Sequence, residues 1–400
     1  MKALIVLENH FYKDDNNNIW CDRIIDYNFL KRYLSVFDKV VVAGRCTRID
    51  KTSDKLLVSG ENMEFVALPD FTGAKGIIRN LSKIKKILRK AILYTDATLY
   101  RAPTHISLFT YKEVLKAKKV LALEFMMAAD KMIDGRGIIK KILNKAIEKK
   151  AQKMCKKANG VAYVTEKILQ QKYPCKAILN GENQKYFTAN YSTIDLEAKD
   201  FYKQDWKEEE KPKVYKIIHT GYMDSYRKGQ DTLIKAVKDV INKGYNVEVT
   251  LIGDGKERQE FEKLAEKLNI QEKVHFKGII KDKYEILKNL RQSHILVFPT
   301  HSEGLPRTII EAMSQGLPCI SSPVDGIPEL LSEDFLIDYD NYQLYSDKII
   351  ELITNWKKMI EISQDNYNKA IKYEKAKLYK ERAMFYQKIR RMAEDENKKR

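Results

Sequence analysis

The stretch that decides the fold reads Phe298-Pro-Thr-His-Ser-Glu-Gly-Leu-Pro-Arg-Thr-Ile-Ile-Glu-Ala-Met-Ser-Gln-Gly-Leu-Pro-Cys-Ile320. The apolar residues 295–298 predict a buried strand that ends where this stretch begins. Pro306 suits the first turn of a helix, because its ring fixes φ and a first-turn residue needs no N–H bond. We therefore predict a helix over residues 308–315 and a second strand over residues 317–321.

A unit of this kind offers a place for an anion. It puts free backbone N–H groups and the positive end of a helix dipole at the carboxyl edge of a parallel sheet, where phosphates are commonly held. Glu303 precedes the predicted helix and Glu311 lies about one turn inside it. Because two carboxylates would repel a phosphate, we expect them to accept hydrogen bonds from sugar hydroxyls. Taken singly, each could equally be a solvated acid of a loop or helix.

The same stretch resembles the donor-site signature of a large enzyme family. The signature combines Glu303-Gly-Leu-Pro-Arg-Thr-Ile-Ile-Glu311 with Gly316-Leu-Pro and Gly326-Ile-Pro-Glu329. It is similar to that of the retaining GT-B glycosyltransferases known as group 1, or family 4. The resemblance implies that Glu303 lies by the transferred sugar and that Glu311 holds the nucleotide ribose. It also implies donor contacts by the residues between them, namely Gly304, Leu305, Arg307 and Thr308.

A second pattern follows a predicted strand and opens a predicted helix, and it reads Gly221-Tyr-Met-Asp-Ser-Tyr-Arg-Lys-Gly229. A lysine at a glycine-flanked helix start is a point charge well placed for a diphosphate. The resembling family has Gly-Arg and Lys-Gly here, which implies that Gly221 lines the donor site and that Lys228 neutralises the leaving diphosphate. Tyr222 replaces the family's frequent arginine, and Arg227 and Arg307 are alternative sources of the missing charge.

Two shorter patterns are less specific. Gly253-Asp254-Gly255 ends another predicted strand and resembles the family's turn beside the nucleotide base, although it is also an ordinary turn sequence. Asp338-Tyr-Asp340 has the spelling of a metal-binding motif, but the resembling family has a variable acidic turn at this place. We interpret it as structural and predict no catalytic metal, and we interpret His301 as a polar loop residue.

Composition predicts a globular protein with two domains. The chain has 400 residues, of which 44% are hydrophobic and 32% charged. Its five cysteines are scattered without a C-x-x-C pair, which argues for a reducing compartment and against a structural zinc. The first eight residues resemble a strand more than a signal peptide, and no run of about 18 apolar residues predicts a membrane span. We expect a cytoplasmic protein, or one on the inner face of the plasma membrane.

The formal charge of +18 suggests an anionic partner. Residues 77–92 and 137–157 combine apolar residues at helical spacing with many lysines and arginines. Such basic amphipathic helices suit an anionic membrane surface, or they are outer helices whose lysines face solvent, and both readings stay open. No nucleic-acid-binding signature accompanies the charge, so we do not expect nucleic acid as a partner.

Strand-like and helix-like segments alternate in two halves, which predicts doubly wound parallel sheets. We expect residues 1–189 to form a Rossmann-like acceptor-side domain and residues 190–213 a charged linker. Residues 214–364 would form a Rossmann-like donor domain, and residues 365–400 a helix that crosses back to the first domain. The resemblance implies the GT-B architecture, in which the two α/β domains face one another across a cleft.

The first domain offers weaker candidates. Residues 8–18 replace the glycine-rich loop that many relatives carry, so their polar side chains are candidates for the acceptor. Four further polar residues lie at or just beyond predicted strand ends and are acceptor-side candidates, or residues satisfied locally: Arg101, His105, Glu124 and Asp130.

The resemblance implies a metal-independent hexosyltransferase. It would move a sugar, with retention, from a nucleoside-diphosphate-sugar co-substrate to a glycan acceptor, which we expect to be lipid-linked and part of a cell-surface polysaccharide. It would need no other cofactor. The alternatives are an epimerase or hydrolase of the same fold that acts on nucleotide sugars, and a non-catalytic protein that binds nucleotide sugars at a membrane surface.

Overall fold

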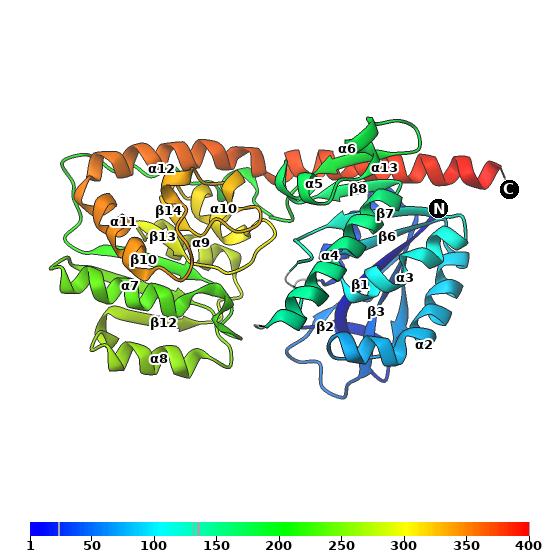
Figure 1. Ribbon diagram of the computed structural model, residues 1–400, viewed down its shortest axis with the longest axis horizontal. Helices are drawn as coiled ribbons and strands as arrows, with labels where there is room; N and C mark the ends of the chain where they lie inside the picture. The colour runs from blue at the N-terminus through cyan, green and yellow to red at the C-terminus, as the bar shows by residue number, and fades with distance from the viewer. Residues whose placement is uncertain (23–24, 131, 134–136, 400) are drawn as a thin grey trace. The chain divides into compact units, whose positions relative to one another are not determined.

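The computed structural model describes residues 1–22, 25–130, 132–133 and 137–399. It divides into two compact units, one made of Met1–Tyr191 with Tyr379–Arg400 and the other of Ser192–Leu378. Each unit is built on a sheet of parallel strands with helices packed along it (Figure 1). The predicted α/β class with doubly wound parallel sheets is therefore confirmed.

The sheet of the first unit runs in the order β5-β3-β1-β6-β7-β8-β9, with every neighbouring pair parallel. Its strands are β1 (Lys2–Lys13), β3 (Lys39–Arg48), β5 (Met63–Leu68), β6 (Ala97–Ala102), β7 (Val120–Phe125), β8 (Gly160–Tyr163) and β9 (Phe187–Asn190). The end of β1 also pairs antiparallel with β2 (Ile19–Cys21), which pairs with β4 (Leu56–Leu57). The central strands are buried along their length, as expected of a parallel sheet covered on both faces.

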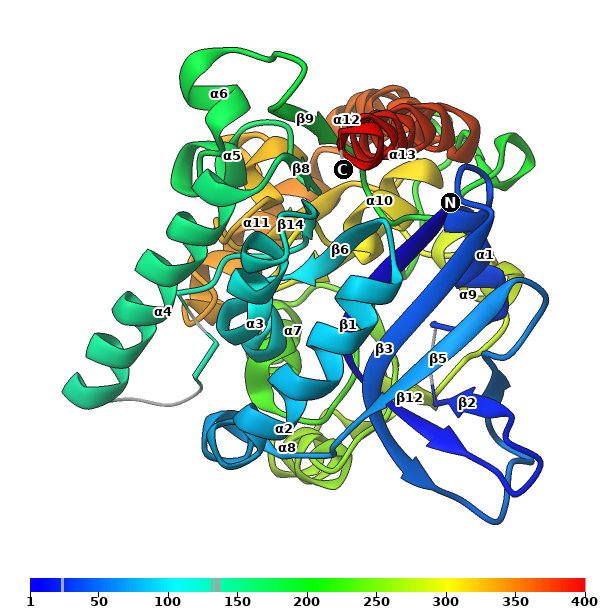
Figure 2. The same ribbon diagram turned by 90° about the vertical axis from the view of Figure 1, so that its right-hand side faces the viewer.

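The helices of the first unit include a group that packs side by side, α2 (Gly73–Tyr94), α3 (His105–Lys116) and α4 (Ile138–Lys157) (Figure 2). On α2 the apolar row predicted from the sequence, with Ile77, Ile84 and Leu88, is fully buried. The remaining helices are α1 (Tyr27–Leu34), α5 (Ile168–Lys172), α6 (Lys176–Asn180) and α13 (Lys375–Lys398). Among the described residues, no helix is both long enough and apolar enough to cross a bilayer.

The second unit has the parallel strand order β12-β11-β10-β13-β14. The strands are β10 (Tyr215–Thr220), β11 (Val247–Ile252), β12 (Val274–Gly278), β13 (Ile295–Phe298) and β14 (Cys319–Ser321). Its helices are α7 (Gln230–Asn242), α8 (Arg258–Lys267), α9 (Lys283–Arg291), α10 (Arg307–Ser314), α11 (Tyr342–Thr354) and α12 (Trp356–Ala370). The predicted strand–loop–helix–strand unit is thus present as β13, α10 and β14.

The structure differs from the sequence-based expectation near the N-terminus. The polar segment after residue 7 is not a loop, because β1 continues to Lys13 and pairs with β2 and β3. The helix expected from residue 20 starts at Tyr27, where Asp26 caps it by accepting a hydrogen bond from the Phe29 amide. Residues 23 and 24 of that expected helix lie outside the described residues.

Part of the segment predicted as a linker packs on the second unit. The Tyr202 amide donates to the Ser314 carbonyl at 2.9 Å, and the Gln204 side chain donates to the Gln315 carbonyl at 2.9 Å. Asp200 is buried and forms an ion pair of 2.7 Å with Lys283 of α9. These contacts fix the path of the chain as it enters the second unit.

Glu124 of β7 lies in the core of the first unit, with 3% of its side chain exposed. Its carboxylate accepts hydrogen bonds from the hydroxyls of Tyr33 at 2.9 Å, Tyr191 at 3.0 Å and Tyr386 at 2.6 Å. Arg101 adds an ion pair of 3.2 Å. Burial raises the pKa of Glu124, but the arginine charge and the tyrosine hydrogen bond outweigh it, so the net pKa lies below its usual value. This network joins α1, β6, β7 and α13.

Replacement of Glu124 by alanine should lower the free energy of unfolding by about 3–5 kcal/mol, because it leaves the Arg101 charge and three hydroxyls buried without their acceptor. Chemical denaturation of the full chain measures this. Glu64→Ala is the matched control: Glu64 pairs with Lys39 at the surface, and its loss should cost less than about 1 kcal/mol. Equal losses in the two variants would contradict the role assigned to Glu124.

Candidate functional site

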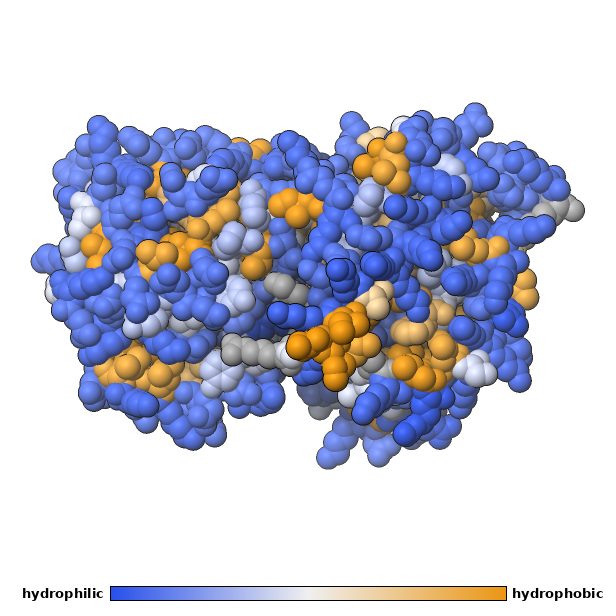
Figure 3. Space-filling model, viewed as in Figure 1, coloured by the Kyte–Doolittle hydropathy of each residue, from blue (hydrophilic) through white to orange (hydrophobic). Residues whose placement is uncertain are grey.

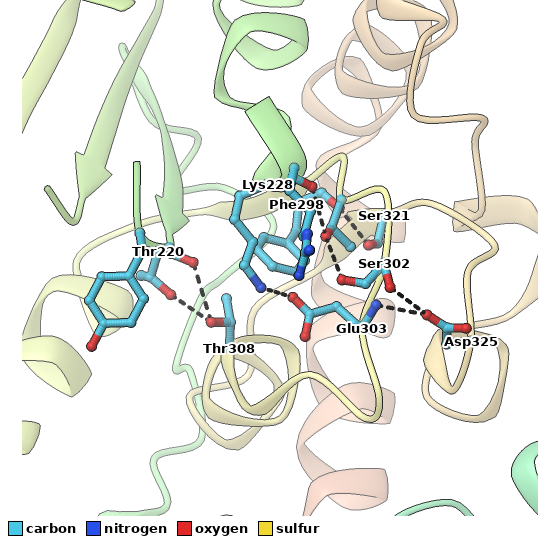
Figure 4. A network of polar contacts seen from close by, with 12 residues as sticks. Thr220, Lys228, Phe298, Ser302, Glu303, Thr308, Ser321 and Asp325 are labelled. Atoms are coloured by element: carbon cyan, nitrogen blue, oxygen red, sulfur yellow. Dashed lines mark hydrogen bonds and ion pairs between the residues drawn. The ribbon is translucent and has the colours of Figure 1, made fainter. Parts of the chain in front are cut away.

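The candidate site lies at the carboxyl edge of the second sheet, where β10 and β13 are neighbours. Lys228 ends the short 3-10 helix Tyr226–Lys228 that follows β10, and Glu303 lies in the loop that follows β13. The Lys228 ammonium forms an ion pair with Oε1 of Glu303 and lies 5.5 Å from the centroid of the Phe298 ring (Figure 4). Two residues that the resemblance singled out independently are therefore in direct contact.

The loop that carries Lys228 is held against the loop after β13. Gly229 has a φ of 75°, and a Cβ at this position would lie 2.0 Å from the Pro299 carbonyl oxygen. Only glycine fits both constraints. The Arg227 carbonyl accepts hydrogen bonds from the His301 amide at 2.8 Å and the Thr300 hydroxyl at 3.2 Å. The position of Lys228 is thus fixed by the backbone on both sides.

His219 supports Lys228 from below and was not identified from the sequence. It is fully buried near the end of β10, and its Nε2 lies 2.9 Å from the Lys228 carbonyl oxygen, so that nitrogen carries the proton and donates. Burial lowers its pKa to about 4, so the ring is neutral at pH 7. Nδ1 has no partner in the described part of the chain. The available signal was a histidine inside an otherwise apolar strand.

The loop that carries Glu303 is held by Asp325. Its Oδ2 accepts hydrogen bonds from the Glu303 amide at 2.8 Å and the Ser302 hydroxyl at 3.2 Å (Figure 4). The next residue, Gly326, donates its amide to the Gly304 carbonyl at 2.9 Å. The Gly-Ile-Pro-Glu segment singled out in the sequence therefore begins where the chain braces this loop, but Asp325 itself was missed.

The start of α10 faces the same region and is open to a ligand. Pro306 is its N-cap and provides no side-chain cap for the first-turn amides. The Thr308 hydroxyl contacts the Thr220 hydroxyl at 2.9 Å and the Thr220 carbonyl at 3.3 Å, which ties α10 to the end of β10. Uncapped N–H groups and the positive end of the helix dipole together favour an anion.

Glu311 is half-buried on α10, and its carboxylate has no hydrogen-bond or ion-pair partner among the described residues. Burial raises the pKa of this carboxyl group, and the charges of Arg307 and Lys283 oppose the rise. A carboxylate taken out of water without a partner costs stability. Such a group indicates a place where a ligand supplies the missing hydrogen bonds.

The turn after β11 crosses the turn after β10 at close range. A Cβ on Gly253 would lie 2.0 Å from the Gly221 carbonyl oxygen, so glycine is required there as well. The Met223 amide donates to the Asp254 carbonyl at 2.9 Å, and Tyr222 between these contacts is 38% exposed. Gly221, Tyr222, Gly253 and Asp254 thus lie together. Their proposed contact with a nucleotide remains a prediction.

The acceptor-side candidates of the first unit differ from one another. Arg101 and Glu124 belong to the buried network described above, so their polar groups are already paired. His105 begins α3, with Nδ1 at 2.9 Å from Oε1 of Glu8. The other oxygen of Glu8 accepts from the Ile106 amide at 2.9 Å. Asp130 pairs with Lys172 at 2.6 Å.

Two observations bear on metal binding. The described residues contain no group of three or more His, Cys, Asp or Glu side chains arranged to hold a metal ion. Asp338 accepts a hydrogen bond from the Asp340 amide at 3.2 Å in the turn before α11. Between them, Tyr339 stacks on His301 with ring centroids 4.1 Å apart. This stacking gives both side chains a packing role.

Comparisons with known proteins agree with this geometry. Residues 199–372 match the model of the family described as glycosyl transferases group 1. Protein CapJ of Staphylococcus aureus is 28% identical over 331 residues, which cover 81% of this chain and 79% of that protein. A phosphatidylinositol N-acetylglucosaminyltransferase of Arabidopsis thaliana is 31% identical over 112 residues, 28% of this chain and 25% of that protein.

Among solved structures, HepE of Anabaena in complex with UDP-glucose aligns over 99% of this chain and 100% of its own, with a TM-score of 0.64 and 14% identity. At this identity the likeness concerns the fold alone. It confirms the predicted GT-B fold, with two Rossmann-like domains.

The burial of neutral His219 makes stability depend on pH. The pKa falls from 6.5 in the unfolded chain to about 4 in the folded one, so the unfolded state binds more protons between these values. The stabilisation is complete above pH 6.5 and is lost as the pH falls to 4, by up to about 3 kcal/mol.

Denaturation of His219→Gln at both pH values should show a smaller loss than the wild type. The control is His275→Gln, because His275 is 47% exposed and should leave the loss unchanged. A wild-type slope in His219→Gln would contradict this account of His219.

Proposed function

Because residues 199–372 match the group 1 glycosyltransferase family on a chain with the GT-B fold, we propose that the protein transfers a sugar from a nucleoside-diphosphate sugar to a glycan acceptor. The observation that carries the proposal is the combination at the second sheet edge. A cation, an uncapped helix start and a half-buried carboxylate without a partner lie on adjoining segments there. These are the groups that a diphosphate joined to a sugar and a ribose requires.

The ion pair explains how the site would receive the donor. Lys228 has three N–H donors, so it can keep Glu303 and also bind a phosphate oxygen. Only Oε1 of Glu303 has a partner within the described residues, which leaves Oε2 to accept a hydrogen bond from a sugar hydroxyl. Glu311 would accept from the ribose hydroxyls, whose donors would compensate its burial. The α10 amides would bind the diphosphate.

We further propose transfer with retention and without a metal ion. As the glycosidic bond to the donor breaks, negative charge develops on the leaving diphosphate, and Lys228 with the α10 dipole would stabilise it. Glu303 would orient the sugar rather than attack it, because its carboxylate is held by Lys228. The acceptor hydroxyl would attack from the face that the diphosphate leaves and would pass its proton to the leaving phosphate.

The acceptor and the setting are proposed on weaker grounds. A hexose transferred to a lipid-linked glycan, in cytoplasmic synthesis of a cell-surface polysaccharide, is supported by the similarity to a transferase that is named for its phosphatidylinositol acceptor. In the first unit, His105 is the candidate for contact with an acceptor, because Glu8 holds Nδ1 and so fixes the orientation of the ring. Tyr222 would contact the donor in place of the family's arginine.

The proposal is tested in two steps with the full chain. A thermal-shift screen against UDP, GDP, ADP and their sugars identifies the donor by its rise in melting temperature. Glu303→Gln should then keep affinity for the nucleoside diphosphate, because Lys228 and α10 remain, but lose roughly 100-fold or more in transfer of radiolabelled sugar. Glu333→Gln, an exposed glutamate of the same unit, should leave both unchanged.

Three results would contradict transfer. Label recovered as free sugar indicates a hydrolase, and label recovered as an altered nucleotide sugar indicates an epimerase. Donor binding with no turnover in the wild type, together with no effect of Glu303→Gln, indicates a non-catalytic protein that binds nucleotide sugars.

A further inference from the structure

The N-terminal end of α4 exposes a group of large apolar side chains. Ile138 is 77% exposed, Ile139 75%, Ile142 63% and Leu143 46%. At 3.6 residues per turn these four side chains fall within an arc of roughly 140° on one side of the helix. Figure 2 shows this end of α4 extending beyond α3, and Figure 3 shows an apolar patch that projects from the surface there.

The lysines of α4 surround this apolar tip and are not paired. The helix contains eight lysines and a single acidic residue, Glu148. Lys145, Lys149 and Lys153 continue the face of Ile138 and Ile142 toward the C-terminal end of the helix and are exposed. Within the described residues none of the eight forms an ion pair, although cations elsewhere on the surface do.

Helix α8 of the second unit shows the contrast. There Lys263 pairs with Glu260 at 2.8 Å, and Arg258 pairs with Glu262 at 2.8 Å. An exposed helix of this chain thus ordinarily carries acidic residues at a spacing that matches its cations. The absence of such residues on α4 leaves its positive charge available to an external anion.

Neighbouring helices add to the positive charge. Lys150 of α4 lies 3.4 Å from the centroid of the Phe109 ring of α3, which holds α4 against that helix. Burial lowers the pKa of Lys150, and the nearby charges of Lys112 on α3 and Lys85 on α2 lower it further. Three adjoining helices therefore bring lysines together beside the apolar tip.

We propose that the first unit docks on a bilayer that contains anionic lipid, with the apolar tip of α4 inserted among the acyl chains and the α4 lysines on the headgroups. The tip is convex and aliphatic, so a fluid phase that closes around it suits it better than a preformed groove. Lysines beside inserted apolar side chains are the pattern of helices that lie in a membrane interface.

A second copy of the chain is a poorer occupant of this surface. Two copies that met through α4 would bring their unpaired lysines together, and each chain carries a formal charge of +18. The proposal also stands apart from the proposed transfer reaction, because none of its residues belongs to the second unit. Failure of one proposal would leave the other intact.

Sedimentation of the full chain with vesicles tests the proposal. The wild type should bind vesicles of phosphatidylcholine with phosphatidylglycerol and should bind phosphatidylcholine alone far more weakly. Ile138→Gln with Ile142→Gln should lower the partition coefficient on anionic vesicles by roughly tenfold or more, because it removes inserted apolar area. Both positions are exposed, so the melting temperature should not change.

The lysines need a control for net charge. Lys145→Glu with Lys149→Glu should lower binding by at least roughly fivefold for each lysine. Lys211→Glu with Lys213→Glu removes the same charge from exposed positions of the second unit and should have little effect in salt. Equal losses in the two pairs would show that net charge alone drives binding, and the docking face would be wrong.

A second measurement reports insertion directly. Tryptophan fluorescence of Ile139→Trp should be quenched by brominated lipid in anionic vesicles beyond the quenching of the wild type. Three results would overturn the proposal: no vesicle binding at low salt, wild-type binding by the Ile138/Ile142 variant, or self-association that this variant abolishes. The last result would assign the tip to a second copy of the chain.

Discussion

The candidate site depends on the close approach of three backbone segments at the carboxyl edge of the second sheet. Gly229 lies against the Pro299 carbonyl and Gly253 against the Gly221 carbonyl, and neither contact leaves room for a Cβ. Because the segments after β10, β11 and β13 are fixed in this way, Lys228 and Glu303 meet without strain in their own side chains. A larger residue at either glycine would separate the loops and with them the charged pair.

Two buried carboxylates show how differently the units use charge. Glu124 in the first unit accepts hydrogen bonds from three tyrosine hydroxyls and pairs with Arg101, and its pKa is lowered. Glu311 in the second unit has no partner among the described residues, and its pKa is raised. The first arrangement stabilises the fold, whereas the second costs stability that a bound ligand would return.

The sequence predicted the part of the site that rests on local patterns. β13 has its predicted bounds, and α10 starts one residue before its predicted position, because proline and glycine mark these boundaries in the sequence itself. The extension of β1 could not be predicted, since it depends on pairing with β2 and β3. The partners of Glu124 were equally hidden, because Tyr33, Tyr191 and Tyr386 are far apart in the chain. His219 and Asp325 act through backbone atoms, which residue patterns do not reveal.

The most direct test of the account is the comparison of stability and binding in Glu311→Gln at pH 7.5. If Glu311 is held unpaired for a ligand, removal of its charge should raise the melting temperature of the free protein, because the cost of burying a carboxylate disappears. The same change should weaken binding of the nucleoside diphosphate by roughly tenfold, measured by calorimetry, because the amide replaces a charged acceptor of hydrogen bonds. A lower melting temperature with unchanged affinity would contradict the account, since Glu311 would then be a structural residue.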